Sequence, residues 1–443
     1  MELLGIKPDR VSFSSDYFQL MYDLCVKLIS SSAAYADDTE ISVMRNERRD
    51  GIASKNRDMS AADSLAARFA EMKSGQGLQW CIRAKISVDD PNKALRDPVI
   101  YRCNLQPHHR TGTTWKVYPT YDFCAPILDS VEEVTYALRT NEYRDRNAQY
   151  AWMQNALGLR PVTIWDFSRI NFVRTVLSKR KLSLLVEKGA VSGWDDPRMP
   201  TVRGIRRRGL TIPALQEFIL KQGPSRNVLN FDWSLLWATN KKFIDPTSPR
   251  FIAVQKENMV VANIHGQERL VQDKPKRNKN ESLATRQVVY SDTILLEQQD
   301  AQSFQLNEEV TLMHWGNAFV RQLVQDPTTK LVSRVEFGLH LAGDVKRTSK
   351  KITWLSQAQD LVPVQLVDFD HIITKDKLDK EDDIVPHINW NSKFVTEAWA
   401  DCNVAALGEG DIIQLERKGY YRVDRPFARG EPAVLFYIPT GKA

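Results

Sequence analysis

The sequence predicts a multidomain protein in which an α/β part is followed by an all-β part. Its 443 residues are enough for two to four domains, each large enough to bury its own core. Helix-like and strand-like periods alternate up to residue 245, whereas only short strand-like runs separated by turns follow Pro246. Regular short strands without intervening helices are typical of β-barrels.

The composition is that of an ordinary globular chain, with 42% hydrophobic and 26% charged residues. Lys and Arg exceed Asp and Glu by 61 to 55, a mildly basic balance that is compatible with nucleic acid without arguing for it. No run of about 18 apolar residues occurs, so no membrane span is expected. The five cysteines are scattered and never spaced as CxxC, which predicts a reducing, cytoplasmic compartment and no structural metal.

The first part of the chain, residues 15–72, has a helical pattern that we expect to be interrupted by a turn or helix cap at 35–39. From residue 79 the period changes to two, which predicts strands at 80–86, 99–103 and 115–119. Between them, neighbouring histidines at 108 and 109 could suggest a metal or a general base, but no carboxylate or thiolate follows at ligand spacing.

Helical periods return beyond residue 121. They predict helices at 131–139 and 147–157, an extended segment at 163–165, and a mostly helical stretch at 195–245. The predicted strands beyond Pro246 lie at residues 251–254, 260–264, 288–290, 335–341, 352–355, 363–369, 412–415 and 433–438.

The strongest candidate for a functional segment is a basic loop at residues 176–181. It reads Val-Leu-Ser-Lys-Arg-Lys and places a hydroxyl and three cations directly after an apolar run. Such a loop suits a polyphosphate, because the cations can meet phosphate oxygens while the hydroxyl and the backbone amides add hydrogen bonds. On spacing alone, a loop that simply faces solvent remains an alternative.

This loop resembles the KMSKS signature of class I aminoacyl-tRNA synthetases, in the variant shared by the glutamyl and glutaminyl enzymes. The following GWDDPRMPT (193–201) and RRRG (206–209) are similar to the same subfamily, and the likeness runs from about Leu4 to the C-terminus. It implies an acceptor-stem-binding insertion at 1–114 and the second half of a Rossmann-like catalytic domain at 115–200. A helical connector at 201–245 and two anticodon-binding β-barrels at 246–443 would follow.

The resemblance is closest to the glutamyl-tRNA synthetases of the eukaryotic cytosol. It implies a glutamate–tRNA ligase that uses ATP, with Mg²⁺ on its phosphates, to form glutamyl adenylate and then transfers glutamate to the terminal adenosine of tRNA(Glu). Ser178, Lys179 and Arg180 would be the catalytic residues, with Lys179 contacting the developing pyrophosphate charge. A scaffold protein of a synthetase complex, bound through a preceding region, is a further partner that the family suggests.

The same family match places the glutamate pocket at the end of the strand that reads Tyr-Pro-Thr at 118–120. Arg139 is informative, because the glutaminyl pattern has a small neutral residue there and a guanidinium can bind the γ-carboxylate of glutamate through two hydrogen bonds. Ala125 leaves space where the glutaminyl pattern has histidine. A structural salt bridge from Arg139 to Glu142 or Asp129 is the competing interpretation. The residues expected to bind glutamate are Tyr121, Asp122, Phe123, Cys124, Ala125 and Arg139.

Further sites follow from the resemblance residue by residue. Glu142 is expected near the ATP ribose, and the tRNA surface is expected at two basic clusters, although solvated cations are the alternative for each. The remaining ATP-binding residues would be Arg169, Ile170, Val176, Leu177, Ser178, Lys179 and Arg180, and the tRNA-binding residues Arg206, Arg207, Lys346 and Arg347.

Two departures from the family pattern are visible. No equivalent of the first signature, the HIGH loop, is found, so we expect the chain to start within the acceptor-binding insertion. A catalytically incomplete tRNA-binding fragment is therefore an alternative to the ligase, and a glutaminyl enzyme is disfavoured by Arg139 and Ala125. The second departure is Glu133, where relatives usually have glycine.

Overall fold

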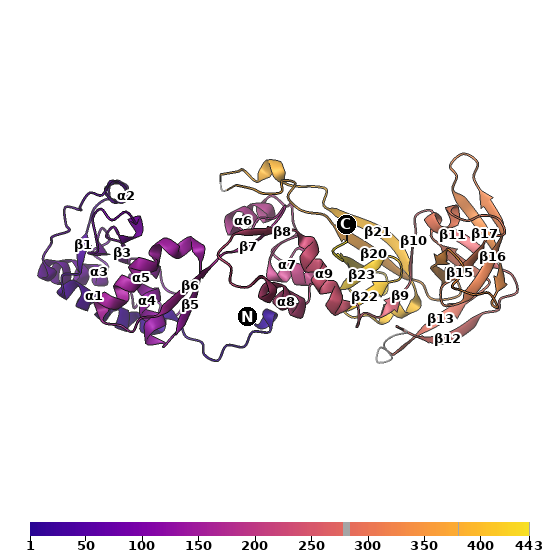
Figure 1. The fold of residues 1–443 in the computed structure, drawn as a ribbon, viewed down its shortest axis with the longest axis horizontal. Coiled ribbons are helices and arrows are strands. Elements are labelled where there is room, and N and C mark those ends of the chain that lie inside the picture. The colour runs from indigo at the N-terminus through magenta and orange to yellow at the C-terminus, as the bar shows by residue number, and fades with distance from the viewer. Residues whose placement is uncertain (278–283, 380, 443) are drawn as a thin grey trace. The chain divides into compact units, whose positions relative to one another are not determined.

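The computed structural model describes residues 1–277, 284–379 and 381–442. Two compact units are present (Figure 1). The N-terminal unit comprises Lys7–Arg169 with Pro224–Leu229, and the C-terminal unit comprises Met1–Ile6, Ile170–Gly223 and Asn230–Ala443. In the described part of the chain, no helix has the length and apolar character needed to cross a membrane.

The N-terminal unit combines a four-stranded antiparallel sheet, in the order β1-β2-β3-β4, with a separate parallel pair of strands, β5 and β6. Its strands are β1 (Ala34–Asp37), β2 (Cys81–Ala84), β3 (Val99–Cys103), β4 (Val117–Pro119), β5 (Tyr136–Thr140) and β6 (Thr163–Phe167). Its helices are η2 (Ser14–Tyr17), α1 (Phe18–Ser30), α2 (Ile41–Asp50), η3 (Asp63–Phe69), α3 (Ala70–Ser74), η4 (Lys93–Leu95), α4 (Tyr121–Val131), η5 (Asn141–Arg146) and α5 (Asn147–Leu157).

One apolar core joins the sheet to the helices on both sides of residue 114. The apolar stripe of α1 supplies Met21, Cys25 and Leu28, all fully buried, as its helical spacing predicts. From beyond residue 114, Phe123 of α4 and Met153 of α5 enter the same core. The compact units therefore do not separate 1–114 from the residues that follow, and the four-part division of the chain stays a prediction.

The turn or helix cap predicted at 35–39 is wrong, because residues 34–37 form strand β1. All four of its side chains are buried, and each residue pairs with a partner in β2, which a single sequence without alternation does not reveal. Asp37 is stabilised in this buried position by an ion pair at 2.7 Å with Arg83, which is also buried.

The helix predicted at 131–139 is also wrong, because helix α4 ends at Val131 and Arg139 lies in strand β5. Glu133 has φ +63°, and the N–H groups of Glu133 and Val134 donate to Ser130 and Asp129 in the pattern of a Schellman motif. A side chain in the left-handed region costs about 1 kcal/mol, which explains why a glycine suits this position.

The helical part of the C-terminal unit follows the short strand β7. Its helices are η1 (Glu2–Leu4), α6 (Lys179–Glu187), α7 (Val202–Arg207), α8 (Ile212–Gln222) and α9 (Trp233–Ile244), and β7 (Ile170–Phe172) pairs with β8 (Leu229–Phe231). Helices α7, α8 and α9 confirm the mostly helical stretch expected at 195–245, and Phe218, Leu236 and Trp237 share one buried cluster.

Two seven-stranded sheets fill the rest of this unit, each around its own apolar core, and each is close to a barrel. The first, called here the β16 sheet, has the order β18-β15-β16-β17-β11-β14-β19, and the second, the β20 sheet, has the order β10-β21-β20-β24-β23-β22-β9. The strands of the β16 sheet are β11 (Val260–Ile264), β14 (Thr293–Leu296), β15 (Glu309–Leu312), β16 (Gly316–Gln325), β17 (Val332–His340), β18 (Lys351–Ile352) and β19 (Trp354–Ser356). The strands of the β20 sheet are β9 (Arg250–Phe251), β10 (Ala253–Gln255), β20 (Val362–Phe369), β21 (Lys393–Ala400), β22 (Ile412–Leu415), β23 (Gly419–Arg425) and β24 (Ala433–Ile438).

The remaining strands of the described residues, β12 (Leu270–Pro275) and β13 (Thr285–Tyr290), form a separate hairpin. Three short helices also belong to this unit. These helices are α10 (Gln298–Gln302), η7 (Val385–His387) and η8 (Cys402–Ala406). The β-rich character predicted after Pro246 is confirmed, but long strands such as β16 and β21 were not predicted. Few of their residues are buried, so they lack the apolar pattern of a buried strand: Asn317, Ala318 and Val320 are the buried residues of β16, and Ala398 and Ala400 those of β21.

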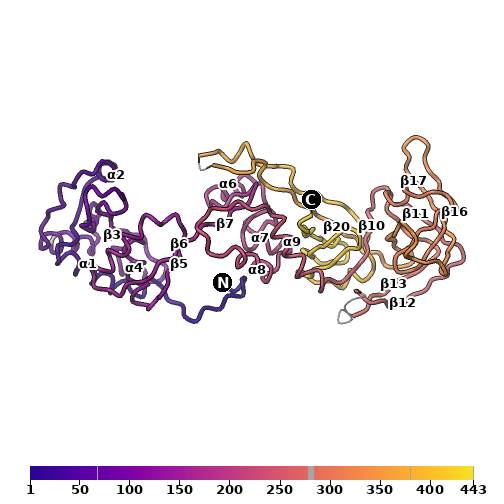
Figure 2. The backbone as a smooth tube through the Cα atoms, viewed as in Figure 1, coloured from indigo at the N-terminus to yellow at the C-terminus, as the bar shows by residue number. Residues whose placement is uncertain are grey.

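The connection between β20 and β21 leaves the β20 sheet and runs to helix α6 (Figure 2). Its apolar residues Ile372, Ile373 and Ile384 share a core with Val176 and Leu185. The backbone N–H of Arg174 donates to the carbonyl of Asp376 at 2.9 Å, and the Lys181 Nζ donates to the carbonyl of Asp379 at 2.8 Å. The β20–β21 connection therefore supplies four of the ten buried residues in the core beneath the basic loop.

Candidate active site

Arg139 lies near the carboxyl end of the parallel pair β5 and β6, where it is the register partner of Asp166. The carboxyl ends of parallel strands are where α/β proteins place ligands. The guanidinium carbon of Arg139 lies 5.5 Å from the ring centre of Tyr121 and 5.4 Å from that of Tyr150. Its Nη1 atom is buried and has no hydrogen-bond partner among the described residues.

The salt bridges considered for Arg139 are not formed. In the described residues, neither Glu142 nor Asp129 has an oxygen within 4.0 Å of its guanidinium nitrogens. Asp129 instead accepts from the Tyr150 hydroxyl at 2.9 Å. Burial raises the pKa of Asp129, and the Tyr150 hydrogen bond and the charge of Arg139 only partly oppose this effect.

Other buried polar atoms without hydrogen-bond partners lie on the elements around Arg139. They are Oδ1 of Asp166 in β6, Oδ1 of Asn141, which follows β5, and Oδ1 of Asn147 at the start of α5. Buried polar groups are normally hydrogen-bonded, and an unsatisfied one costs about 1–3 kcal/mol. Sequence reasoning missed these three residues, although their positions at strand ends and a helix start were a usable signal.

The predicted glutamate-binding residues separate into two groups. Tyr121, which is 55% exposed, lines a small pocket with Asp122, Ala125 and Arg139. Asp122 is engaged by Arg146, whose Nη1 donates to both of its carboxylate oxygens at 2.6 and 2.7 Å.

The other two predicted residues face away from this pocket. Phe123 is fully buried in the core of the N-terminal unit, and Cys124 packs against the same core. Burial raises the pKa of the Cys124 thiol to about 11. Both side chains therefore support the wall, because successive residues of a helix cannot all point to the same side.

Glu142 and Arg169, both expected near ATP, are brought together. The Arg169 Nη2 lies 2.5 Å from Glu142 Oε2, and both side chains are about half exposed. Ile170 begins the second segment of the C-terminal unit and packs against the buried cluster of α8 and α9.

The basic loop lies at the N-terminus of helix α6 in the C-terminal unit. Ser178 is the N-cap residue and makes no side-chain cap hydrogen bond, and Lys179 and Arg180 occupy the first two helical positions. All three are exposed, and within the described residues neither cation has a carboxylate within 4.0 Å. Unpaired N–H groups, the positive end of the helix dipole and two free cations together make an anion-binding surface.

Buried residues anchor both sides of this surface. Val176 precedes it and is buried, Leu177 is 38% exposed, and Leu182 and Leu185 follow on the buried face of α6. In the GWDDPRMPT segment (193–201), which follows α6, the Asp196 side chain stabilises a turn.

The Asp196 carboxylate accepts from the backbone N–H groups of Ser192 and Arg198 and from the Arg198 guanidinium at 2.8–2.9 Å. Burial opposes its ionisation, but these hydrogen bonds outweigh burial and hold its pKa at about 2.

The two clusters predicted to bind tRNA differ in their contacts. Arg207 is held by Asp424 of β23 at 2.7 and 2.9 Å and by Asp195 at 3.1 Å. Lys346 and Arg347 are exposed in the loop between β17 and β18, and in the part of the chain that the structure describes, no carboxylate lies within 4.0 Å of them. Arg206 is half-buried and, among the described residues, likewise has no ion pair.

Three family profiles match this chain. Residues 1–246 match the catalytic domain of class I tRNA synthetases (E and Q), and residues 248–340 and 351–424 match two anticodon-binding domains of the same class. The first match alone covers more than half of the chain. The chain belongs to the class I (E and Q) tRNA synthetases.

Relatives in this family are similar over the whole chain. A probable cytoplasmic glutamate–tRNA ligase of Schizosaccharomyces pombe is 54% identical over 99% of the chain, and the cytoplasmic glutamate–tRNA ligase of Saccharomyces cerevisiae is 54% identical over 100%. The cytoplasmic enzyme of Arabidopsis thaliana is 47% identical over 99% of the chain. The chain spans 62% of the length of each of these three relatives.

Proposed function

We propose that the chain carries the glutamate-, ATP- and tRNA-contacting surfaces of a cytoplasmic glutamate–tRNA ligase. The observation that supports this best is Arg139, whose buried Nη1 has no hydrogen-bond partner among the described residues and whose neighbours Tyr121 and Ala125 line the same small pocket. A half-buried guanidinium with a buried, unpaired nitrogen favours a ligand that brings a carboxylate. The γ-carboxylate of glutamate is such a group.

The same arrangement would reject glutamine. The amide of glutamine would direct N–H donors at the Arg139 guanidinium, which has only donors itself, and would leave both groups unsatisfied. Sites that depend on such polar pairing discriminate by about 10⁴–10⁵-fold. A small side chain at Ala125 adds no donor or acceptor of its own that could favour an amide.

In the proposed first step, the α-carboxylate oxygen of glutamate attacks the α-phosphorus of ATP, and the bond to pyrophosphate breaks. Lys179 and Arg180 are suited to the charge that develops on the leaving pyrophosphate, because both are exposed, without carboxylate partners in the described residues, and beside helix N–H groups. Mg²⁺ would accompany ATP on its phosphates as part of the substrate. In the second step, the terminal hydroxyl of tRNA attacks the glutamyl carbonyl and AMP leaves.

The tRNA surface is proposed at Arg206, Lys346 and Arg347, whose cations lack carboxylate partners within the described residues. Arg207 was expected to share this role. Because its guanidinium is occupied by Asp424 and Asp195, we propose that its contribution to tRNA binding is small.

The decisive test is glutamate-dependent ATP–pyrophosphate exchange in the presence of tRNA(Glu), with glutamine as the competing amino acid. Arg139→Cys should lower kcat/KM for glutamate by about 10⁴-fold or more while the Kd for tRNA stays unchanged. Arg144→Cys is a matched control, since Arg144 is exposed in the adjacent η5 and outside the pocket.

Three outcomes would contradict the proposal in different ways. Equal losses of glutamate use and tRNA binding would remove Arg139 from the amino-acid pocket. Exchange with glutamine in the unmodified chain would make the enzyme a glutaminyl ligase. Binding of tRNA without exchange would leave the chain a tRNA-binding protein and withdraw the catalytic assignment.

A further inference from the structure

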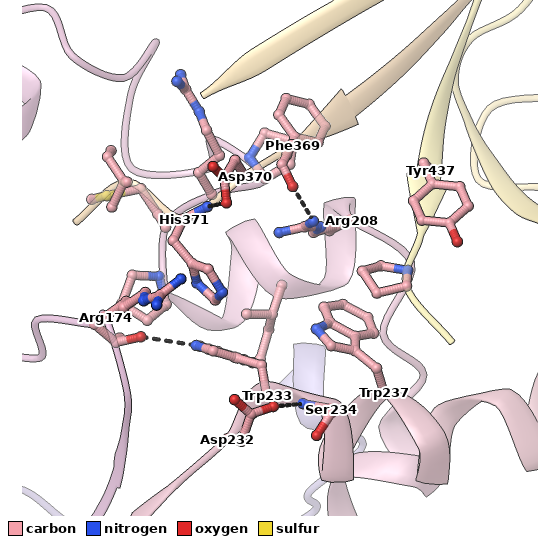
Figure 3. Close-up of a pocket in the computed structure, with 18 of the residues that line it drawn as sticks. Arg174, Arg208, Asp232, Trp233, Ser234, Trp237, Phe369, Asp370, His371 and Tyr437 are labelled. Atoms are coloured by element: carbon pink, nitrogen blue, oxygen red, sulfur yellow. Dashed lines mark hydrogen bonds between the residues drawn. The ribbon is translucent and has the colours of Figure 1, made fainter. Parts of the chain in front are cut away.

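A cavity of about 490 Å³ lies within the C-terminal unit, beside the segment that leads into the basic loop (Figure 3). Its walls come from residues 174–176, from helices α7 and α9, from the start of the β20–β21 connection, and from the end of β24. Cavities of this size commonly hold small organic ligands. None of the glutamate-, ATP- or tRNA-binding residues proposed above lines it except Val176.

The apolar part of the wall is aromatic. Trp233 and Trp237 of α9, Phe369 of β20 and Tyr437 of β24 all line the cavity. The Trp233 Nε1 donates to Thr175 Oγ1 at 2.8 Å, which fixes the indole plane. Flat apolar surfaces of this kind favour a flat apolar ligand, because stacking adds to the burial of area.

The polar part of the wall contains two cations, Arg208 and Lys442, that have no carboxylate partner among the described residues. Arg208 donates through Nη2 to the carbonyl of Phe369 at 2.6 Å, and its buried Nε has no hydrogen-bond partner among the described residues. In Figure 3 the Arg208 side chain lies between Phe369 and Trp237 and faces the cavity. Within the described residues, no carboxylate oxygen lies within 4.0 Å of its nitrogens, unlike Arg174 and Arg198, which are paired with Asp376 and Asp196.

The carboxylates that line the cavity are engaged elsewhere. Asp232 caps α9 by accepting from the Ser234 N–H at 2.7 Å, and Asp368 accepts from the Phe369 N–H at 2.7 Å. Asp370 accepts from the N–H of His371 at 2.6 Å and from Asn389 at 3.3 Å. None of them satisfies Arg208, so an anion that enters the cavity would find an unmet donor and a positive charge.

We propose that this cavity is a binding site for a small aromatic carboxylate, whose ring lies on the indoles of Trp233 and Trp237 and whose carboxylate meets the positive charge of the Arg208 guanidinium. This site is separate from the proposed amino-acid pocket, which belongs to the N-terminal unit. A bound ligand would touch Thr175, which precedes the basic loop, and His371 of the β20–β21 connection at the same time. It would therefore restrict both segments together.

The test is a calorimetric titration of the chain with 1-naphthoate, repeated with the neutral analogue 1-naphthamide. We expect saturable binding of 1-naphthoate at one site and at least tenfold weaker binding of 1-naphthamide. Equal affinities for the two probes, or no saturable binding at millimolar concentration, would overturn the proposal. This comparison requires no variant and so does not depend on how a substitution folds.

Substitutions then locate the site. Arg208→Met should weaken 1-naphthoate binding at least tenfold, and Arg208→Lys, which keeps the charge, should weaken it less. Arg203→Met is the matched control, because Arg203 is exposed on the same helix and does not line the cavity. Unchanged affinity in a folded Arg208→Met chain, judged by its thermal unfolding, would place the probe elsewhere and overturn the assignment.

Discussion

The connector cluster (Arg206, Arg207, Arg208) and the barrel-loop cluster (Lys346, Arg347, Lys350, Lys351) look alike in the sequence but differ in the folded chain. In the connector cluster, Arg207 is paired with Asp424 and Arg208 faces a cavity. In the barrel-loop cluster, Lys350 is paired with Glu308, whereas Lys346 and Arg347 are exposed without a carboxylate in the described residues. A run of cations therefore identifies a nucleic-acid surface only after its internal partners are known.

The difference arises from long-range packing. Asp424, the partner of Arg207, lies 217 residues further along the chain, in strand β23 of the β20 sheet. Lys346 and Arg347 lie in a loop between β17 and β18, whose own acidic residue, Asp344, accepts from the backbone N–H of Lys346. Satisfied cations hold the fold together, and the remaining exposed ones are available for phosphate.

A third cation extends the comparison and carries the largest expected effect. Lys179 is exposed like Lys346, but it lies at a helix N-terminus beside free N–H groups. Lys179→Ala should slow adenylate formation by about 10²–10³-fold with little change in tRNA affinity. Single-turnover kinetics would measure this, and Lys188→Ala, at the other end of α6, is the control. An unchanged rate would remove Lys179 from the phosphate site.

The next prediction concerns the internal role of Arg207. Arg207→Met should lower the free energy of unfolding by about 2 kcal/mol, because it leaves Asp424, which is 13% exposed, without its bidentate partner. Urea unfolding would measure the loss, and a double-mutant cycle with Asp424→Asn would isolate the pair. Arg206→Met should leave stability nearly unchanged. If Arg207→Met weakened tRNA binding as strongly as Arg206→Met and left stability intact, the comparison would fail.

Acid should destabilise the GWDDPRMPT segment, which contains Asp196. The folded pKa of Asp196, about 2, is below its ordinary value of 3.8, so its contribution is complete above about pH 4 and is lost as pH falls towards 2. The contribution is about 2 kcal/mol by linkage. The difference in unfolding free energy between the native chain and Asp196→Asn, measured from pH 5 to pH 2.5, should shrink accordingly. A difference that does not depend on pH would contradict this assignment.

The smallest predicted effect belongs to the barrel-loop cluster. Replacing Lys346 and Arg347 together by Ala should weaken tRNA binding about tenfold, roughly 1.4 kcal/mol, and reduce the salt dependence by about two ion contacts, with no loss of stability. Lys350→Met is the internal control, because Lys350 is already paired with Glu308. Filter binding at several salt concentrations would measure both quantities, and an unchanged salt slope would return these cations to ordinary solvated surface.

Local signals in the sequence predicted the parts of the fold that local forces determine. The apolar stripe of α1, the change to strands after Pro246, and the basic loop at the start of α6 all follow from spacing. Strand β1 and the position of Arg139 were not predicted, because pairing with β2 and β6 decides them. A left-handed Glu133 that ends α4 gives no sign in a single sequence. The ion pair between Arg207 and Asp424 was not predicted either, because its two residues are far apart in the sequence.

The candidate pocket was predicted only in part, for the same reason. Tyr121, Ala125 and Arg139 do meet, but Phe123 and Cys124 turn into the core. Asp166 and Asn147 join the polar cluster from elements that follow later in the chain. A family motif identifies residues that lie near a site; the helix period decides which of them can touch a ligand.

The shared core beneath the basic loop has a consequence for synthesis of the protein. The hydrogen bond from Arg174 to Asp376 spans 202 residues, and the one from Lys181 to Asp379 spans 198. At about 5–20 residues per second, a ribosome needs roughly 10–40 s after it has synthesised α6 to add the β20–β21 connection, which completes this core. During that interval the apolar face of α6 has none of its later partners. The nascent chain must therefore leave the core beneath its basic loop unfinished until the β20–β21 connection has emerged.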